Sequence, residues 1–177
     1  MDETENTHTP GKRQIVESLD REFARLYVSA CVVIEHCSPD ILYADRAETA
    51  SASGPLPSVG ESVLRSAAAI EQTFGGITAN LWDDPFEWTL PEYLSTPVKV
   101  RDYLAEVEAT RRRAFSSFAD DACLRKQIAV PAGGTRLLID LLLETLRQAD
   151  VYQTQAAFVL RILWGISLPG LLSNPRL

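Results

Sequence analysis

The chain has little histidine, and this shortage removes several kinds of active site. Its 177 residues include two histidines, His8 and His36. His8 lies in a polar N-terminal stretch, and His36 points away from the apolar face of the helix predicted around it. Its neighbour Cys37 diverges from it by about 100°, so the two cannot pair as base and nucleophile. The sequence therefore shows neither a catalytic triad nor a histidine metal motif, and it has no glycine-rich phosphate loop.

Cysteine is scarce as well, and no apolar run is long. Cys31, Cys37 and Cys123 form no CxxC pair, and their odd number and irregular spacing fit reduced thiols. No N-terminal segment has the order of a signal peptide, and no apolar run reaches the ~18 residues that a membrane span needs. We therefore expect a cytoplasmic protein without a membrane partner.

Positive charge is also in short supply. There are 17 Lys and Arg residues against 24 Asp and Glu residues, a formal net charge of −7. This balance argues against nucleic acid as a partner, because such binding needs clustered cations. The one basic run, Arg111 to Arg113, points in three directions if it is helical. The composition, 46% hydrophobic and 23% charged, is typical of a globular domain.

The chain does contain four long segments with helical periodicity. Ser58 and Glu61 form a capping box before the second, Thr96-Pro97 begins the third, and Thr135 is the expected N-cap of the fourth. No strand alternation or internal repeat accompanies them. The predicted helices cover residues 13–37, 58–82, 97–119 and 135–163.

These segments predict an all-α fold, a four-helix bundle with long connections after the first and second helices. We expect the bundle to occupy residues 13–170, after a disordered tail at 1–12 and before a C-terminal tail at 171–177. The stretch from Lys126 to Val130 could be slightly extended, and Gly133-Gly134 permits a tight turn.

Four polar residues fall on or beside the apolar faces of these helices, which is where bundles build ligand sites. Ser66 lies inside the apolar stripe of the second helix, and Arg111 inside that of the third, where a buried cation needs a partner or a route to water. On the fourth, Gln148 lies at the edge of the face and Tyr152 on it, one turn later. The rest of that face is Leu138, Leu141, Leu142, Thr145, Ala149, Ala156, Val159, Leu160 and Leu163.

The order of these features resembles the DinB-like superfamily. That group includes metal-dependent thiol S-transferases and the N-terminal domain of mycothiol-dependent maleylpyruvate isomerase. The resemblance covers roughly Ile15 to Pro169 and is carried by Pro57–Ser66, Ile70-Glu71 and the block from Gly134 to Gly165. It implies a four-helix bundle, often a homodimer.

The family's metal site has one His on the second helix and an HxxxH pair on the fourth, ahead of a Gln. Matched by position, these histidines fall on Ser66, Gln148 and Tyr152, with Gln155 as the matching Gln. A register one turn earlier would supply one carboxylate, Glu144, and still no imidazole. Hydroxyl, amide and phenol groups do not hold zinc or nickel at useful affinity, so the resemblance implies a lost metal site.

We therefore expect a non-catalytic bundle, either a small-molecule-binding protein or a dimer, with no cofactor. Ser66, Gln148 and Tyr152 would either fill the ancestral cavity as a hydrogen-bonded cluster or line a pocket with Arg111. In the pocket, Arg111 would offer its charge to a carboxylate or phosphate.

The alternative is a metal-independent, thiol-dependent S-transferase or isomerase-like enzyme. Tyr152 and Arg111 would then stabilise the thiolate of a low-molecular-weight thiol. A homodimer is the expected assembly, because the apolar residues Trp164, Ile166 and Leu168 near the C-terminus favour a partner surface.

Overall fold

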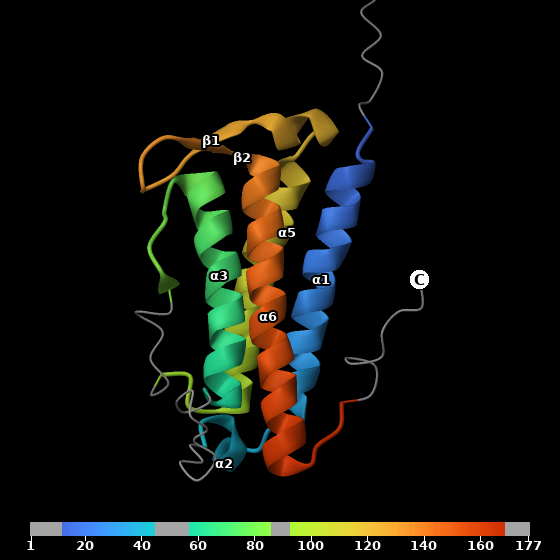
Figure 1. Ribbon diagram of the computed structural model, residues 1–177, viewed down its shortest axis with the longest axis vertical. Helices are drawn as coiled ribbons and strands as arrows, with labels where there is room; N and C mark the ends of the chain where they lie inside the picture. The colour runs from blue at the N-terminus through green and yellow to red at the C-terminus, as the bar shows by residue number, and fades with distance from the viewer. Residues whose placement is uncertain (1–11, 45–56, 86–92, 169–177) are drawn as a thin grey trace, which may run out of the picture.

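The computed structural model describes residues 12–44, 57–85 and 93–168. Over these ranges the chain is mostly helical, which confirms the all-α class (Figure 1). The predicted C-terminal tail lies outside the described residues, as does the N-terminal tail except for Lys12. The long helices are α1 (Gln14–Glu35), α3 (Val59–Ala79), α5 (Pro97–Ser117) and α6 (Leu138–Trp164).

Four short elements complete the described chain. Helix α2 (Pro39–Leu42) follows α1, and a 3-10 turn, η2 (Asp121–Arg125), follows α5. The strands β1 (Gln127–Ala129) and β2 (Thr135–Leu137) then form a hairpin before α6. No helix in the described ranges combines the length and the apolarity needed to cross a bilayer.

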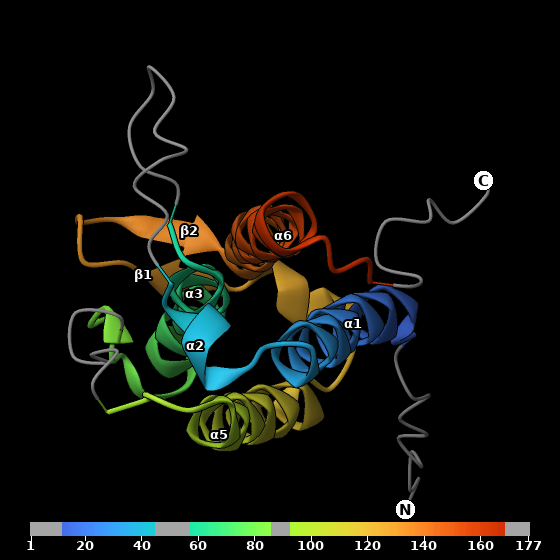
Figure 2. The same ribbon diagram turned by 90° about the horizontal axis from the view of Figure 1, so that it is seen from below.

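The four long helices form a ring when the molecule is seen along its length. Around the ring the order is α3, α6, α1 and α5, and each helix packs against the next (Figure 2). Helices α1 and α6 run in one direction, and α3 and α5 run in the other. The end of α3 and the start of α5 therefore lie at opposite ends of the bundle. This arrangement accounts for the predicted long connection between them.

The helix ends follow local side-chain chemistry. The capping box of α3 is present, because Ser58 Oγ accepts the Glu61 N–H at 3.1 Å and Glu61 Oε2 accepts the Ser58 N–H at 2.8 Å. Helix α3 ends at Ala79, earlier than the predicted Trp82, because Asn80 adopts a left-handed conformation with φ 56°. The Trp82 ring then covers Gly76, where a Cβ atom would lie 2.4 Å from the indole.

The prediction that Thr135 caps the last helix is wrong. Thr135 pairs with Ala129 in the antiparallel hairpin, and α6 begins three residues later, at Leu138. Gly133 and Gly134, with φ of 87° and 82°, make the predicted turn. The turn joins two strands, and each strand is too short for its alternation to be read from the sequence.

An aromatic cluster fills the centre of the bundle. Phe23 of α1, Phe74 of α3 and Phe115 of α5 are mutually in contact, with ring centroids 5.3–5.7 Å apart. Phe118, the residue after α5, extends the cluster at 5.3 Å from Phe115. These rings lie on three of the four helices and fix how α1, α3 and α5 pack.

Candidate functional site

A small cavity lies between α1, α3, α5 and α6, beside the aromatic cluster. Its volume is about 20 Å³, which suits about one water molecule. Apolar side chains make most of its wall. The polar residues that line it are Ser66 on α3, Glu108 and Arg111 on α5, Gln153 on α6 and Tyr27 on α1.

Ser66 and Gln153 form a hydrogen-bonded network across three helices. The buried Ser66 hydroxyl donates to the Ala149 carbonyl oxygen at 3.0 Å. Gln153 Nε2 donates to Ser66 Oγ at 3.2 Å and to the Leu26 carbonyl oxygen at 2.8 Å. The network therefore joins α3, α6 and α1, and it uses the one hydrogen of the Ser66 hydroxyl and both hydrogens of the Gln153 amide.

One atom of this network lacks a partner. Gln153 Oε1 is buried and accepts no hydrogen bond from the described residues. A buried acceptor without a donor costs about 1–3 kcal/mol, and a water in a cavity of this size could supply the donor. The cavity therefore holds one unused acceptor and no room for a larger ligand.

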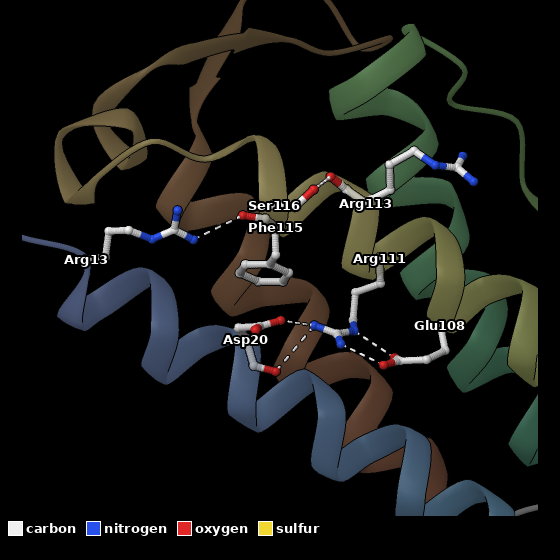
Figure 3. Close-up of polar contacts among 7 residues, drawn as sticks. All are labelled: Arg13, Asp20, Glu108, Arg111, Arg113, Phe115 and Ser116. Atoms are coloured by element: carbon white, nitrogen blue, oxygen red, sulfur yellow. Dashed lines mark hydrogen bonds and ion pairs between the residues drawn. The ribbon is translucent and has the colours of Figure 1, made fainter. Parts of the chain in front are cut away.

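Arg111 lies in the same cavity wall with its charge fully compensated (Figure 3). Its side chain is 3% exposed. Nε and Nη2 donate to the two carboxylate oxygens of Glu108, each at 2.7 Å, and Nη1 pairs with the Asp20 carboxylate on α1. Burial lowers the pKa of Arg111, but the hydrogen bonds to Glu108 and Asp20 outweigh burial, so its pKa is raised. Of the two predicted alternatives for Arg111, a partner or a route to water, the structure shows the partner.

The four predicted site residues do not come together. Ser66 and Arg111 line the cavity, but Gln148 is exposed, Tyr152 is half-buried, and neither belongs to the cavity wall. The expectation that Gln148 and Tyr152 stand with Ser66 in the interior is therefore wrong for Gln148. A ligand-binding role for these residues stays a prediction.

The error has a geometric cause. The buried stripe of α6 at this level consists of Thr145, Ala149 and Gln153, each one turn from the next. Residues 148 and 152 each precede a member of that stripe, so they are rotated about 100° away from it. Tyr152 looks more suited to a core than Gln153, because aromatic side chains are buried more often than amides. Counting one turn on from Thr145 and Ala149 would have found Gln153.

The residues at the cavity do not suit a transition metal. No three His, Cys, Asp or Glu side chains in the described ranges come together as a metal-binding group. Around the cavity the possible ligand groups are the Ser66 hydroxyl, the Gln153 amide and the Tyr27 phenol, and the one described carboxylate, Glu108, is held by Arg111. Zinc and nickel sites need imidazole, thiolate or free carboxylate ligands, so these donors do not fit the metal site typical of the DinB-like superfamily.

The cysteines are poor nucleophiles at neutral pH. Burial raises the pKa of Cys37 to about 12, and its thiol donates to the Val33 carbonyl oxygen. Burial also raises the pKa of Cys31 and of Cys123. Because the thiolate is the reactive form, all three thiols are held in the unreactive one.

Comparisons with known proteins add no further constraint. Neither the protein-family models, nor the curated proteins, nor the solved structures include a match to this chain.

Proposed function

We propose that the chain is a metal-free, DinB-like bundle that acts by binding rather than by catalysis. The observation that supports this is the network of Ser66, Ala149 and Gln153. If the match on the fourth helix is shifted by one residue toward the C-terminus, the family's HxxxH pair falls on Ala149 and Gln153. The histidine of the second helix still falls on Ser66. The three ligand positions then converge, but they carry a hydroxyl, a methyl group and an amide. The hydroxyl donates to the Ala149 backbone carbonyl oxygen, and the amide donates to the hydroxyl and to the Leu26 carbonyl oxygen.

The polar groups of the interior also have little left for chemistry. Arg111 is neutralised by Glu108 and Asp20, and Ser66 donates to a helix carbonyl. A thiol-dependent enzyme would need Arg111 and Tyr152 at one site, and Tyr152 does not line the cavity of Arg111. Support for the binding role therefore exceeds support for the thiol-dependent alternative.

Metal analysis of protein purified without a histidine tag tests this proposal. We expect far less than one zinc, nickel or iron per chain, and an unfolding midpoint that a chelator leaves unchanged. Stoichiometric metal, or a midpoint that falls when the metal is removed, would contradict the proposal.

The C-terminal residues expected to form the partner surface are not exposed as expected, because Leu168 is buried and Trp164 and Ile166 pack half-buried against the core. A different surface favours a homodimer as the assembled form. Val151, Phe158 and Ile162 on α6 are 55%, 50% and 59% exposed. Their spacing places them along one outer stripe of the helix, with the uncharged Thr154 and Gln155 beside them. An exposed apolar stripe of this kind suits the same stripe of a second copy across a twofold axis.

Sedimentation of the full chain at micromolar concentration tests the dimer. We expect a dimer for the wild type and a monomer for Phe158→Asp, which places a charge in the stripe. Val28→Asp is the matched control, because Val28 is 58% exposed on α1, outside the stripe, and this variant should remain dimeric. A monomeric wild type, or equal behaviour of the two variants, would reject the interface.

A further inference from the structure

A second hollow, larger than the interior cavity, lies at the hairpin end of the bundle. It is a groove of about 430 Å³ between α3, α5 and the β1–β2 hairpin. Its apolar wall is formed by Ile77, Ala114, Phe118, Ile128 and Leu138. This volume lies within the range of small-molecule sites, about 300–1,000 Å³, whereas the interior cavity is far below it.

Two cations line this groove, and neither has an ion-pair partner among the described residues. Arg113 on α5 and Lys126, before β1, are both exposed and both part of its lining. Neither forms an ion pair with a carboxylate in the part of the chain that the structure describes, and no described Asp or Glu lines the groove. In a chain of net charge −7, this is a local region of positive charge beside an apolar wall.

The backbone fixes where these cations stand. Arg113 leaves α5 toward α3, on the side opposite to Arg111, which points to α1 (Figure 3). Two residues on a helix are rotated by about 200°, so the sequence places the two arginines on different faces. Both backbone polar groups of Lys126 are hydrogen-bonded. Its N–H donates to the Cys123 carbonyl oxygen at 3.0 Å, and its carbonyl oxygen accepts from the Leu138 N–H at 2.9 Å.

The hydroxyls of the groove divide into used and free groups. Thr78 Oγ1 donates to the Phe74 carbonyl oxygen at 2.6 Å, and Ser117 Oγ donates to the Ala114 carbonyl oxygen at 2.7 Å. Thr110 also lines the groove, and its hydroxyl has no hydrogen bond to the described residues. The groups free to donate are therefore Arg113, Lys126 and Thr110, which together suit an anionic oxygen.

We propose that this groove binds a small organic anion, a carboxylate on an apolar body. The carboxylate would accept from Arg113, Lys126 and Thr110, and the apolar body would cover Phe118, Ile128 and Leu138. This inference rests on the proposed binding function and names its ligand class and its site. The groove shares no lining residue with the interior cavity.

An NMR titration of the full chain with sodium octanoate tests the proposal. We expect saturable shifts of the amides of Ile77, Thr110 and Ile128. Octan-1-ol keeps the apolar body and lacks the charge, and acetate keeps the charge and lacks the body. Both should bind at least about tenfold more weakly, because each loses one of the two contributions. Octanol or acetate binding as tightly as octanoate would overturn the proposed ligand class.

A matched pair of double variants tests the site itself. Arg113→Gln with Lys126→Gln should weaken octanoate binding at least about tenfold, since it removes two cations that solvent only partly screens. Arg112→Gln with Arg125→Gln makes the same change of charge at adjacent exposed positions outside the lining, and it should leave the affinity unchanged. All four side chains are exposed, so both variants should keep the wild-type unfolding midpoint.

The outcomes separate the two proposals. Equal affinity in the two double variants, or no saturable binding of octanoate to the wild type, would overturn the groove as an anion site while leaving the metal-free bundle in place. Stoichiometric metal in the purified protein would overturn the proposed function instead, whatever octanoate does.

Discussion

The interior cavity and the hairpin-end groove use the same kinds of residue in opposite ways. In the cavity, Arg111 is buried and paired with Glu108 and Asp20. In the groove, Arg113 is exposed, and no carboxylate of the described residues lies beside it in the lining. The two arginines are two residues apart on α5 and leave it on opposite sides (Figure 3).

The difference indicates that the presence of an ion-pair partner distinguishes a structural arginine from one that is available to a ligand, whereas the residue type does not. A buried cation with its carboxylates in place is part of the packing, because its donors are already used. A cation beside an apolar wall without a carboxylate keeps its donors for a ligand. The polar residues that first suggest a site are then the ones that hold the helices together.

The largest predicted difference is in stability, between variants that replace Arg111 and variants that replace Arg113. Arg111→Met leaves the Glu108 carboxylate, which is 14% exposed, without its bidentate partner. Loss of one member of a buried pair costs about 3–5 kcal/mol, so we expect a loss of that size in the free energy of unfolding. Arg113→Met should stay within about 0.5 kcal/mol of wild type. Urea unfolding followed by circular dichroism measures both.

Arg112→Met is the control for that experiment, because Arg112 lies between the two on the exposed side of α5. It should behave like Arg113→Met. A loss below about 1 kcal/mol for Arg111→Met would mean that the ion pairs contribute no more than surface pairs do.

The sequence predicted the long helices and several of their ends well. Helical periodicity persists over twenty or more residues in each, and the Ser58–Glu61 box and the Thr96 cap are local signals. The first strand, Gln127–Ala129, lies within the stretch from Lys126 to Val130 that was predicted to be slightly extended. The second strand, Thr135–Leu137, was missed, because three residues are too few to show a period. Thr135, a good cap residue, is also a good strand residue, and the pairing with Ala129 decides between the two.

The site was harder to predict, because it depends on the phase of a helix and on contacts between distant segments. A shift of one residue separates Tyr152 from Gln153 and moves the side chain from the edge of α6 to the cavity. The Asp20 partner of Arg111 lies 91 residues away in the chain. The sequence states that Arg111 needs a partner, but it does not say which carboxylate packing will bring to it.

A triple histidine variant tests which residues of α6 face Ser66 in the interior. Ser66→His, Ala149→His and Gln153→His together place three imidazoles where the hydrogen bonds now converge. We expect zinc to raise the free energy of unfolding of this variant by about 2–3 kcal/mol at a hundredfold excess over Kd. Thermal and urea unfolding with and without zinc measure the effect.

The comparison variant carries histidine at Ser66, Gln148 and Tyr152 instead. Because Gln148 is exposed and Tyr152 does not line the cavity, its imidazoles should not converge, and zinc should leave its stability nearly unchanged. Equal stabilisation of the two variants would show that the one-residue shift in register is wrong.

A small effect should come from Gln153→Met, which tests whether the interior amide is needed at all. The change removes the hydrogen bonds to Leu26 and Ser66, but it also removes the unpartnered Oε1. Ser66 keeps its bond to Ala149, and the Leu26 carbonyl keeps its place in the helix. We expect the free energy of unfolding, measured with urea, to change by no more than about 1 kcal/mol. The loss of two hydrogen bonds is offset because the buried Oε1 atom without a donor is removed as well.

Gln14→Met is the control, since Gln14 is exposed on α1, outside both the cavity and the apolar stripe of α6. A loss above about 2 kcal/mol for Gln153→Met alone would mean that a water or another donor satisfies Oε1, so that the network is complete. A small loss would mean that methionine fills the space as well as glutamine does. In that case the interior amide holds no ligand, and octanoate binding in the groove should be unaffected by its removal.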